Sequence, residues 1–296
     1  MLEKIPYEVV GMKYSLVKDD LGYYRCDPLP TEEELTVLYQ SFYTSEKPDY
    51  IGQQEEDIRW WNAMYDDRLT VMSEIYRKSS NKIWPLMLDI GCGGGFFLRR
   101  AYMNRTLPWL CVGVEPNPVA LEYARDKSKY FDGGAIFYET SLENVKETRF
   151  WGIHISEVLE HLRNPLEMLK EAYDRLLVGG CICVVVPNEK ISFWTLFLYP
   201  HVFQPPQHIN YFDFDSLEGL LKQAGFEIYE RSAMYPMEDF LKMGYDYINN
   251  PTVGRICHQH RKNFDLAMTP EERRTFYKGL AKNNIGRESV IYAIKK

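Results

Sequence analysis

The sequence predicts an α/β fold in which a mostly parallel sheet of seven strands carries helices on both faces. From residue 83 onward, short apolar runs alternate with segments of helical periodicity, which is typical of parallel sheets. A glycine-rich turn, Gly91-Cys-Gly-Gly-Gly95, joins the first of these runs to a helix. Residues 181–186 are continuously apolar, as expected for a strand that is buried on both faces.

Composition narrows the class of protein. The chain has 296 residues, of which 45% are hydrophobic and 26% charged, and its net charge is −7. This balance argues against nucleic acid or an anionic membrane as the main partner. The N-terminus lacks a signal-peptide pattern, and the longest apolar run, residues 191–203, is too short to span a bilayer. We therefore expect a soluble, cytoplasmic protein.

The six cysteines predict neither a zinc ribbon nor a redox motif, because no two of them form a C-x-x-C pair. Cys181 and Cys183 alternate along an apolar strand, where buried thiols are expected.

Residues 1–82 are predicted to form an N-terminal helical cap. Within it, short strands at 14–17 and 22–25 come before the helices. Thr31 is a good helix N-cap, and Glu34 follows at the spacing of a capping box. A longer helix is expected over residues 55–78, where apolar residues recur at helical spacing. Aromatic residues are frequent in this cap, and core packing is the expected role of most of them, although a tyrosine among them could reach a ligand of the next domain; they include Tyr43, Tyr50, Trp60, Trp61 and Tyr65.

Residues 83–296 form the second predicted domain. Gly179-Gly180 is expected to end the third of its helices, and Ser216 to cap the fourth. Residues 233–286 read as a largely helical insertion before the last strand, serving as a charged lid, an anion-binding surface or a homodimer contact. The strands are expected at 83–90, 110–115, 135–138, 152–156, 181–186, 226–230 and 289–294, and the helices at 96–103, 117–128, 164–177 and 217–223.

The position of Glu115 indicates a nucleoside ligand. It ends the second strand, one βα unit after the glycine turn. In doubly wound sheets, an acidic residue at this position can accept hydrogen bonds from both ribose hydroxyls. The spacing Gly91-x-Gly93-x-Gly95 differs from the G-x-G-x-x-G of dinucleotide enzymes, which argues against a dehydrogenase.

Several motifs in order resemble class I S-adenosylmethionine-dependent methyltransferases, in particular the broad bacterial group that methylates sugars, quinones and other small metabolites. The resemblance covers about residues 83–232 and implies a Rossmann-like fold with S-adenosylmethionine as methyl donor and S-adenosylhomocysteine as product. It rests on Leu88-Asp-Ile-Gly-Cys-Gly-Gly-Gly, Gly113-Val-Glu-Pro-Asn-Pro, Ser156-Glu-Val-Leu-Glu-His-Leu-Arg-Asn-Pro, Leu177-Val-Gly-Gly, Val184-Val-Val-Pro-Asn and His208-Ile-Asn-Tyr-Phe.

The resemblance also implies a role for each part of the site. The methionine end of the donor would be held at the glycine turn, the ribose at Glu115, and the adenine beside Pro116 and the turn after the third strand. The residues at the end of the fourth strand would lie beneath the transferred methyl. The implied cofactor-binding residues are Asp89, Gly91, Cys92, Gly93, Glu115, Pro116, Ser141, Leu142, Ser156 and Glu157.

Two histidines are candidate catalytic bases, because methylation of a hydroxyl requires a proton to leave. His161 follows the fourth strand, and His208 follows the fifth, past an aromatic loop at 193–203. The ordinary pKa of histidine, near 6.5, suits a base at neutral pH. His154 lies inside a strand, where a hydrogen-bonded core histidine is the expected role.

A metal site is the alternative use of the same residues, although we assign no metal ligand. Glu157, Glu160, His161 and His208 match the ligand pattern of ubiquinone-pathway O-methyltransferases and small-RNA 3′-end methyltransferases. Two carboxylates and two imidazoles could hold a divalent cation that acidifies a substrate hydroxyl. The acidic chain argues against an RNA substrate.

The predicted function is therefore S-adenosylmethionine-dependent methylation of a small metabolite, with a hydroxyl of a sugar, nucleotide-sugar or related compound as the leading acceptor and carbohydrate biosynthesis as the setting. Metal-assisted methylation of a catechol, a quinol or an RNA end is one alternative. A non-catalytic subunit that only binds the donor is another, but it would be expected to lack an intact glycine turn or the ribose acid, and this chain has both.

Overall fold

A computed structural model describes residues 14–43, 49–79, 85–104, 107, 109–129, 136–189 and 205–296 of the chain. The predicted strand starts at Ile83 and Ala135 lie outside these residues. The aromatic loop at 193–203 lies wholly outside them.

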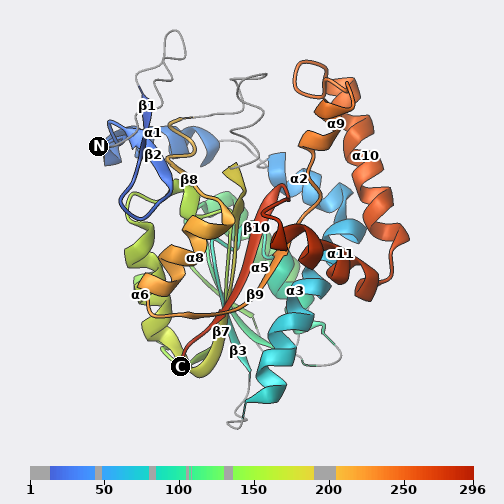
Figure 1. Cartoon of the computed structure of the whole chain (residues 1–296). Helices are drawn as coiled ribbons and strands as arrows, with labels where there is room; N and C mark the ends of the chain where they lie inside the picture. Colours follow the sequence, from blue (N-terminus) through green and yellow to red (C-terminus); the bar gives the residue numbers. More distant parts are fainter. Residues whose placement is uncertain are drawn as a thin grey trace.

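The centre of the molecule is a seven-stranded sheet with the order β5-β4-β3-β6-β7-β10-β9, which confirms the predicted fold class (Figure 1). Neighbouring strands from β5 to β7 are parallel, whereas β10 runs antiparallel to both β7 and β9. The strands are β3 (Leu86–Ile90), β4 (Leu110–Val114), β5 (Ile136–Glu139), β6 (Phe150–Ser156), β7 (Leu176–Pro187), β9 (Glu227–Ala233) and β10 (Glu288–Ile294).

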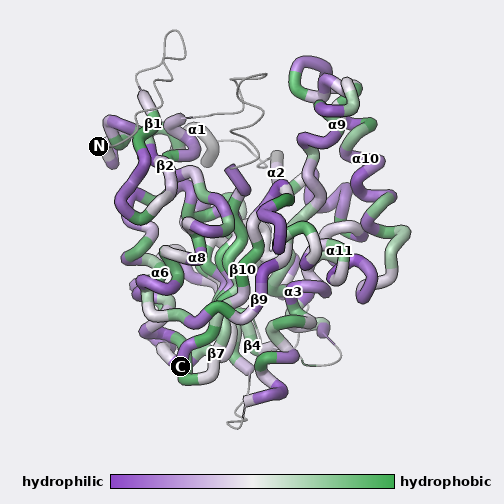
Figure 2. Tube along the Cα trace, viewed as in Figure 1, coloured by the Kyte–Doolittle hydropathy of each residue, from purple (hydrophilic) through white to green (hydrophobic). Residues whose placement is uncertain are grey.

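Helices cover both faces of this sheet because successive strand residues point to opposite sides. On one face, Ile182 and Val184 of β7 pack in the same core as α6 (Pro165–Arg175) and α8 (Phe214–Gln223). On the other face, Cys181 and Cys183 pack with α3 (Ile58–Lys78), α4 (Phe96–Tyr102) and α5 (Pro118–Ser128). The strands in the middle of the molecule are accordingly hydrophobic (Figure 2).

Cys181 and Cys183 are buried in the sheet, as the sequence predicts. All six are free thiols with buried side chains. Among the described residues, no helix has both the length and the apolar character needed to cross a membrane.

Between β9 and β10, the insertion forms the helices α9 (Glu238–Lys242), α10 (Pro251–Ala267) and α11 (Pro270–Lys282), of which α10 and α11 lie beside α3 (Figure 1). Several of its basic side chains bind acidic residues of the cap. The Nε2 atom of His258 lies 2.5 Å from Asp57 Oδ2, and Lys262 binds the other oxygen of Asp57. Arg273 forms a two-point ion pair with Asp67, with distances of 2.6 and 3.1 Å. These cations hold the insertion to the cap. Fewer basic side chains of the insertion are therefore left to bind an external anion. The lid and homodimer roles of the insertion stay predictions.

The N-terminal strands β1 (Ser15–Lys18) and β2 (Tyr24–Asp27) form a small antiparallel sheet with β8 (Asn210–Tyr211), a strand that sequence reasoning missed. The helix α1 (Glu32–Tyr43) begins with the predicted capping box, because the N–H of Thr31 donates to Glu34 and the N–H of Glu34 donates to Thr31 Oγ1. Since β8 belongs to the later part of the chain, the cap and the sheet domain are joined by backbone hydrogen bonds, and the boundary at residue 82 stays a prediction.

Two predicted helices differ at their ends. The helix expected over 164–177 ends at Arg175, and β7 begins at Leu176, so that Gly179 and Gly180 lie inside a strand. The reason is that this segment pairs with the end of the chain, next to β10. The N–H of Gly179 donates to Lys295 O (2.7 Å), and the N–H of Lys295 donates to Gly180 O (3.0 Å). The cap of α8 is Asp213, and Ser216 is its capping-box partner three residues later.

The helix expected over 55–78 is divided into α2 (Asp49–Glu56) and α3. The division falls at Asp57, whose side chain does not cap α3. Its carboxylate instead binds His258 and Lys262 of α10. The insertion, which is distant in sequence, thus determines where this helix breaks.

Candidate active site

The glycine turn lies at the carboxyl ends of β3 and β4, as predicted. The N–H groups of Gly91 and Cys92 donate to Val114 O at 2.8 and 2.9 Å, which joins the turn to β4. Gly91 has φ +75°, and a Cβ atom there would lie 2.3 Å from Val158 Cγ2. Only glycine fits this position, and its missing side chain keeps the backbone accessible to a ligand.

Glu115 is bound to the same turn. Its Oε2 accepts a hydrogen bond from the N–H of Gly93 (2.8 Å), and its Oε1 accepts one from the N–H of Asn117 (2.8 Å). Burial raises the pKa of Glu115, whereas these two hydrogen bonds act in the opposite direction. Each carboxylate oxygen keeps a second lone pair, which a ribose hydroxyl could use.

The two predicted residues beside these glycines point into the protein. Asp89 is 2% exposed, and its Oδ1 lies 2.7 Å from His154 Nδ1. The thiol of Cys92 packs inward, where a Cβ atom on Gly113 would lie 2.8 Å from its sulfur. Burial also raises the pKa of this thiol well above its ordinary value. Cys92 can therefore contact a ligand through its backbone, whereas its side chain belongs to the core.

The residues predicted to lie around the adenine follow β4 and β5. Pro116 is exposed between Glu115 and Asn117. Ser141 and Leu142 begin a short 3₁₀ turn after β5, whose last residue, Glu139, accepts the backbone N–H of Glu115 (3.0 Å). The side chain of Leu142 is buried in the core on the α6 side. This position leaves only the backbone of Leu142 for the predicted adenine contact.

Ser156 and Glu157 stand at the carboxyl end of β6, the next strand of the sheet. Ser156 Oγ accepts a long hydrogen bond from Arg68 Nη1 (3.4 Å). Glu157 has a positive φ of 56°, which is uncommon for a residue with a side chain and is a frequent feature of functional sites. The side chain is exposed, yet protein surrounds it closely enough to raise the pKa of Glu157, with Glu160 and Glu288 adding to the shift.

Glu160, His161 and His208 converge beside this strand end. Each offers one ligand atom, and the three atoms lie within 4.8 Å of one another. Glu160 is 1% exposed, and within the part of the chain that the structure describes no N–H or O–H donor reaches its carboxylate oxygens, although the carboxyl of Glu157 lies beside it. His161 Nε2 lies 3.8 Å from Glu160 Oε1, and the imidazole rings of His161 and His208 are 4.9 Å apart.

The small N-terminal sheet explains how these groups come together. The Nδ2 atom of Asn210, in β8, donates to Leu159 O (3.0 Å) and to Leu162 O (2.6 Å), which holds the 3₁₀ turn that carries Glu160 and His161. In the same segment, the N–H of Ile209 donates to Glu160 O (2.9 Å). His208 is next to this paired segment and therefore faces His161.

Sequence reasoning underestimated three residues that lie near the carboxyl ends of these strands. Tyr50 lies over the turn, because a Cβ atom on Gly93 would be 3.3 Å from its ring. Arg68 is 4% exposed and contacts Ser156, so it belongs to the interior of the site and not to the solvent-facing side of α3. Arg287 binds Glu238 (2.6 Å) and lies near enough to His208 to lower its pKa. Their sequence context carries no motif, and only packing between distant elements brings them here.

Comparison with known proteins identifies the family. Residues 64–231, more than half of the chain, match the model of a methyltransferase domain. The chain belongs to this methyltransferase family. It is thus a class I S-adenosylmethionine-dependent methyltransferase domain in which S-adenosylmethionine donates the methyl group and S-adenosylhomocysteine is the product, as the sequence motifs predict.

Curated relatives of this methyltransferase share only part of its length. A mitochondrial ubiquinone biosynthesis O-methyltransferase of Candida albicans is 29% identical over 147 residues, which is 48% of this chain and 43% of the relative. The corresponding protein of Schizosaccharomyces pombe is 25% identical over 163 residues, which is 49% of this chain and 58% of the relative. The methyltransferase thus spans about half the length of the curated relatives it matches.

Solved structures show the same fold at low identity. A chain from the complex between the Haloferax volcanii Trm112 methyltransferase activator and a methyltransferase superposes with a TM-score of 0.53. That match has 12% identity and covers 86% of this chain and 96% of the other. The cyclopropane synthase MmaA2 of Mycobacterium tuberculosis gives a TM-score of 0.50 at 15% identity, covering 76% of this chain and 83% of the other. The likeness supports the Rossmann-like architecture alone.

Proposed function

We propose that this methyltransferase transfers the methyl group of S-adenosylmethionine to a hydroxyl oxygen of a small metabolite, and that a divalent cation held by Glu160, His161 and His208 assists. One observation carries the proposal. No N–H or O–H donor among the described residues reaches either oxygen of the buried Glu160 carboxyl, which has the carboxyl of Glu157 beside it and His161 Nε2 at 3.8 Å. Buried carboxylates are normally paired or coordinate a metal.

The hydrogen bond on the other side of the His161 ring explains why a proton or a cation belongs between His161 and Glu160. His161 Nδ1 lies 2.7 Å from Gln207 O, and a carbonyl can only accept, so Nδ1 carries the proton. In the uncharged ring, Nε2 then presents a lone pair toward Glu160. Burial also lowers the pKa of His161, so this ring is uncharged at neutral pH. Two acceptors that face each other repel unless a proton or a cation lies between them.

Either occupant fits the electrostatics of the cluster. Without a metal, burial raises the pKa of Glu160 to about 8, which means that a proton occupies the site at neutral pH. A divalent cation would replace that proton and use the carboxylate and both imidazoles as ligands. Glu157, three residues before Glu160 and beside it, is the proposed fourth ligand. The residues present therefore fit a metal ion.

A histidine acting alone as the base is less well supported. Burial, with His161 and Arg287 adding to it, lowers the pKa of His208 to about 3. A group of such low basicity is a weak acceptor for a hydroxyl proton, because catalytic efficiency follows the match of pKa to working pH. A bound metal ion would lower the pKa of the hydroxyl itself. We therefore propose that His161 and His208 serve as ligands in preference to free bases.

We propose a catechol or quinol as the acceptor ahead of a sugar or nucleotide-sugar hydroxyl. Two observations support this order: the curated relatives carry the name ubiquinone biosynthesis O-methyltransferase, and neighbouring aromatic hydroxyls can chelate a metal ion. A hydroxyl in carbohydrate biosynthesis is the second candidate and is supported by the sequence resemblance. The glycine turn is intact and Glu115 is present. These two features give no support to a subunit that binds the donor without activity.

The test is methylation of a panel of catechols, quinols and sugars before and after exhaustive chelation. We expect activity on a catechol or quinol, its loss on chelation, and its return with added Mg²⁺, Mn²⁺ or Zn²⁺. Glu160→Gln should abolish the response to metal, whereas Glu143→Gln, on an exposed turn, should not change it. Full activity after chelation would overturn the metal and return His161 or His208 to the role of base. Methylation of sugars alone would overturn the proposed order of acceptors.

A further inference from the structure

A buried chain of polar contacts runs from the middle of α3 to the strand that leads into the glycine turn. Arg68 of α3 is 4% exposed, and His154 of β6 and Asp89 of β3 are each 2% exposed. Arg68 Nη1 lies 3.2 Å from His154 Nε2, and His154 Nδ1 lies 2.7 Å from Asp89 Oδ1. The contacts connect three elements that are distant in sequence.

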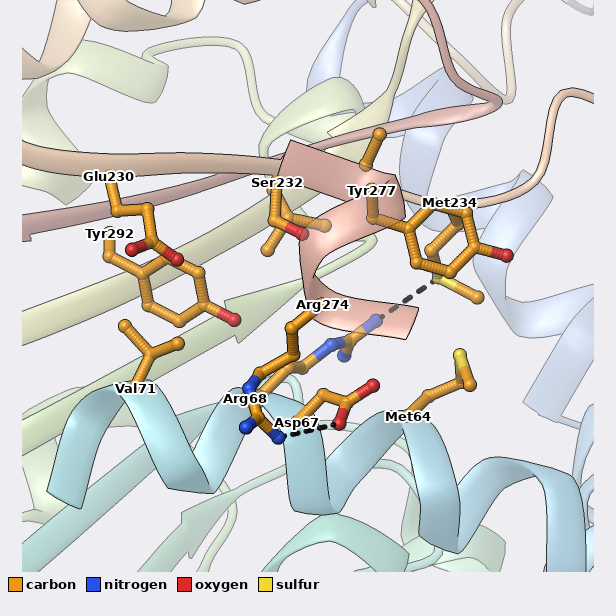
Figure 3. Close-up of a pocket in the computed structure, with 12 residues that line it drawn as sticks. Met64, Asp67, Arg68, Val71, Glu230, Ser232, Met234, Arg274, Tyr277 and Tyr292 are labelled. Atoms are coloured by element: carbon orange, nitrogen blue, oxygen red, sulfur yellow. Dashed lines mark hydrogen bonds and ion pairs between the residues drawn. The ribbon is translucent and has the colours of Figure 1, made fainter. Parts of the chain in front are cut away.

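Arg68 is held at its own end of this chain by several groups. Its Nη2 lies 3.6 Å from Met234 Sδ and 4.0 Å from Glu288 Oε2, and its Nη1 is within 3.4 Å of Ser156 Oγ. Figure 3 shows Arg68 on α3 at the edge of a small cavity, between Asp67 and Met234. A guanidinium held in this way presents its donors in a defined direction.

The position of each proton follows from the chemistry of Arg68. A guanidinium can only donate, so His154 Nε2 must accept and must lack a proton. The proton of the neutral ring is therefore on Nδ1, which donates to Asp89 Oδ1. The ring of Phe97 stacks on that of His154 with centroids 3.8 Å apart, which fixes the plane of the imidazole.

Asp89 retains an oxygen for another partner. Its Oδ1 is occupied by His154, while its Oδ2 makes no hydrogen bond to any residue that the structure describes. Asp89 also lies two residues before Gly91, at the end of the strand that opens the donor site. A carboxylate oxygen in this position is suited to accept from an ammonium group.

We propose that Arg68 and His154 are positioning residues of the donor site: Arg68 keeps His154 as its uncharged Nδ1–H tautomer, and His154 thereby orients the carboxyl of Asp89 toward the amino group of S-adenosylmethionine. This inference rests on the role proposed for Asp89 by the family resemblance. It assigns to α3, which precedes the predicted methyltransferase core, a share in holding the methyl donor.

The charge of Arg68 makes the proposal specific. Next to Asp89 alone, an imidazole would tend to bind a second proton, and the resulting cation would compete with the donor's ammonium for the carboxylate. Arg68 opposes that protonation. The other groups around the ring do not supply a charge at neutral pH: burial raises the pKa of Tyr65 on α3 and raises that of Cys183 on β7 to about 12. Phe97 of α4 is apolar.

The experiment measures the affinity of the full chain for S-adenosylhomocysteine by calorimetry between about pH 6 and pH 8. We expect the wild-type affinity to be nearly constant over this range. Arg68→Met should bind about tenfold more weakly at the acidic end than at the basic end, because His154 becomes protonated. Arg77→Met, which removes an exposed cation of the same helix, should behave as the wild type. A pH-independent affinity in Arg68→Met overturns the inference.

Two further measurements remain informative if Arg68→Met folds poorly. His154→Asn keeps an uncharged N–H donor for Asp89 and should bind within about threefold of the wild type, whereas His154→Leu should lose at least about tenfold. Equal losses in the two variants would overturn the inference. In the wild type, the ¹⁵N shifts of His154 should show a neutral ring protonated at Nδ1, and protonation at Nε2 would overturn it.

Failure of this inference can be separated from failure of the site itself. If the wild type does not bind S-adenosylhomocysteine, the donor site is wrong. If it binds and Asp89→Asn binds equally well, the role of Asp89 is wrong. If both of these hold and Arg68→Met follows the wild type, only the positioning role of Arg68 and His154 is wrong.

Discussion

Glu115 Oε2 accepts a 2.8 Å hydrogen bond from the backbone N–H of Gly93. The bond joins the end of β4 to the turn after β3, two segments that a nucleoside ligand would contact together. Its partner bond, from the N–H of Asn117 to Oε1, fixes the carboxylate from the other side. Glu115 therefore holds the glycine turn in place, in addition to its predicted role in binding the ribose.

Replacing Glu115 with alanine should weaken the binding of S-adenosylhomocysteine by more than about 1.5 kcal/mol, the scale of hydrogen bonds to a charged group. Calorimetry measures the change directly. Glu122→Ala, on the exposed side of α5, is the matched control and should bind as the wild type does. An unchanged affinity in Glu115→Ala would show that this carboxylate does not hold the ribose.

Gly91→Ala should destabilise the protein and remove donor binding. The added Cβ would lie 2.3 Å from Val158 Cγ2 at a backbone φ of +75°, so steric overlap and an unfavourable conformation act together. We expect a loss of more than about 2 kcal/mol in the free energy of unfolding, measured by urea denaturation.

The control for this change is Gly279→Ala in α11. A Cβ there meets nothing within 4 Å, and alanine is the better helix former. This variant should be as stable as the wild type or more stable, by up to about 1 kcal/mol. If Gly91→Ala is equally well tolerated, the turn does not have the close packing seen between Gly91 and Val158.

Asp57→Asn should loosen α10 from α3 and make stability less dependent on acid pH. Burial alone would raise the pKa of Asp57, but hydrogen bonds from Lys262 and His258 outweigh it and lower the pKa below its ordinary value of 3.8. A lowered folded-state pKa gives stability that is present above the unfolded value and lost as the pH falls through the folded value. Asp57→Asn should thus unfold more easily at neutral pH.

Urea denaturation at several pH values measures the effect. The difference between Asp57→Asn and the wild type should be about 1–3 kcal/mol at neutral pH and should shrink below about pH 4. The exposed Asp174 on α6 provides a control, since Asp174→Asn should stay within about 0.5 kcal/mol of the wild type. A constant difference down to low pH would show that the charge of Asp57 does not hold the two helices together.

Asn210→Leu should impair both stability and activity. Asn210 is fully buried, and its Nδ2 satisfies the carbonyls of Leu159 and Leu162 on either side of His161. Loss of these bonds removes the side-chain donor of the Leu162 carbonyl and one of two donors of the Leu159 carbonyl, which costs about 1–3 kcal/mol, and frees the turn that holds Glu160. Thermal unfolding and methylation assays report the two effects. Asn263→Ala, exposed on α10, should change neither.

The succession of strands along the chain, the glycine turn and the acid at Glu115 could all be predicted, because they depend on local patterns. Apolar runs, glycine at positive φ and a carboxylate after a strand are visible within one βα unit. The end of α6 and the break at Asp57 could not be predicted in the same way. In both places, backbone or side-chain groups are taken up by partners far along the chain, Lys295 in one case and Lys262 in the other.

By itself, the sequence determined the fold class and the methyl donor, since these follow from short motifs and their spacing; the residues around the donor stay predictions. Only the tertiary structure decided how the acidic and imidazole groups meet. Glu160 is buried beside His161 in a turn that is held by hydrogen bonds from Ile209 and Asn210, residues that lie about 50 positions further along the chain. Arg68 reached His154 because the insertion and the sheet bury α3. Burial and long-range contact change the chemistry of these side chains, and neither is encoded by spacing along the chain.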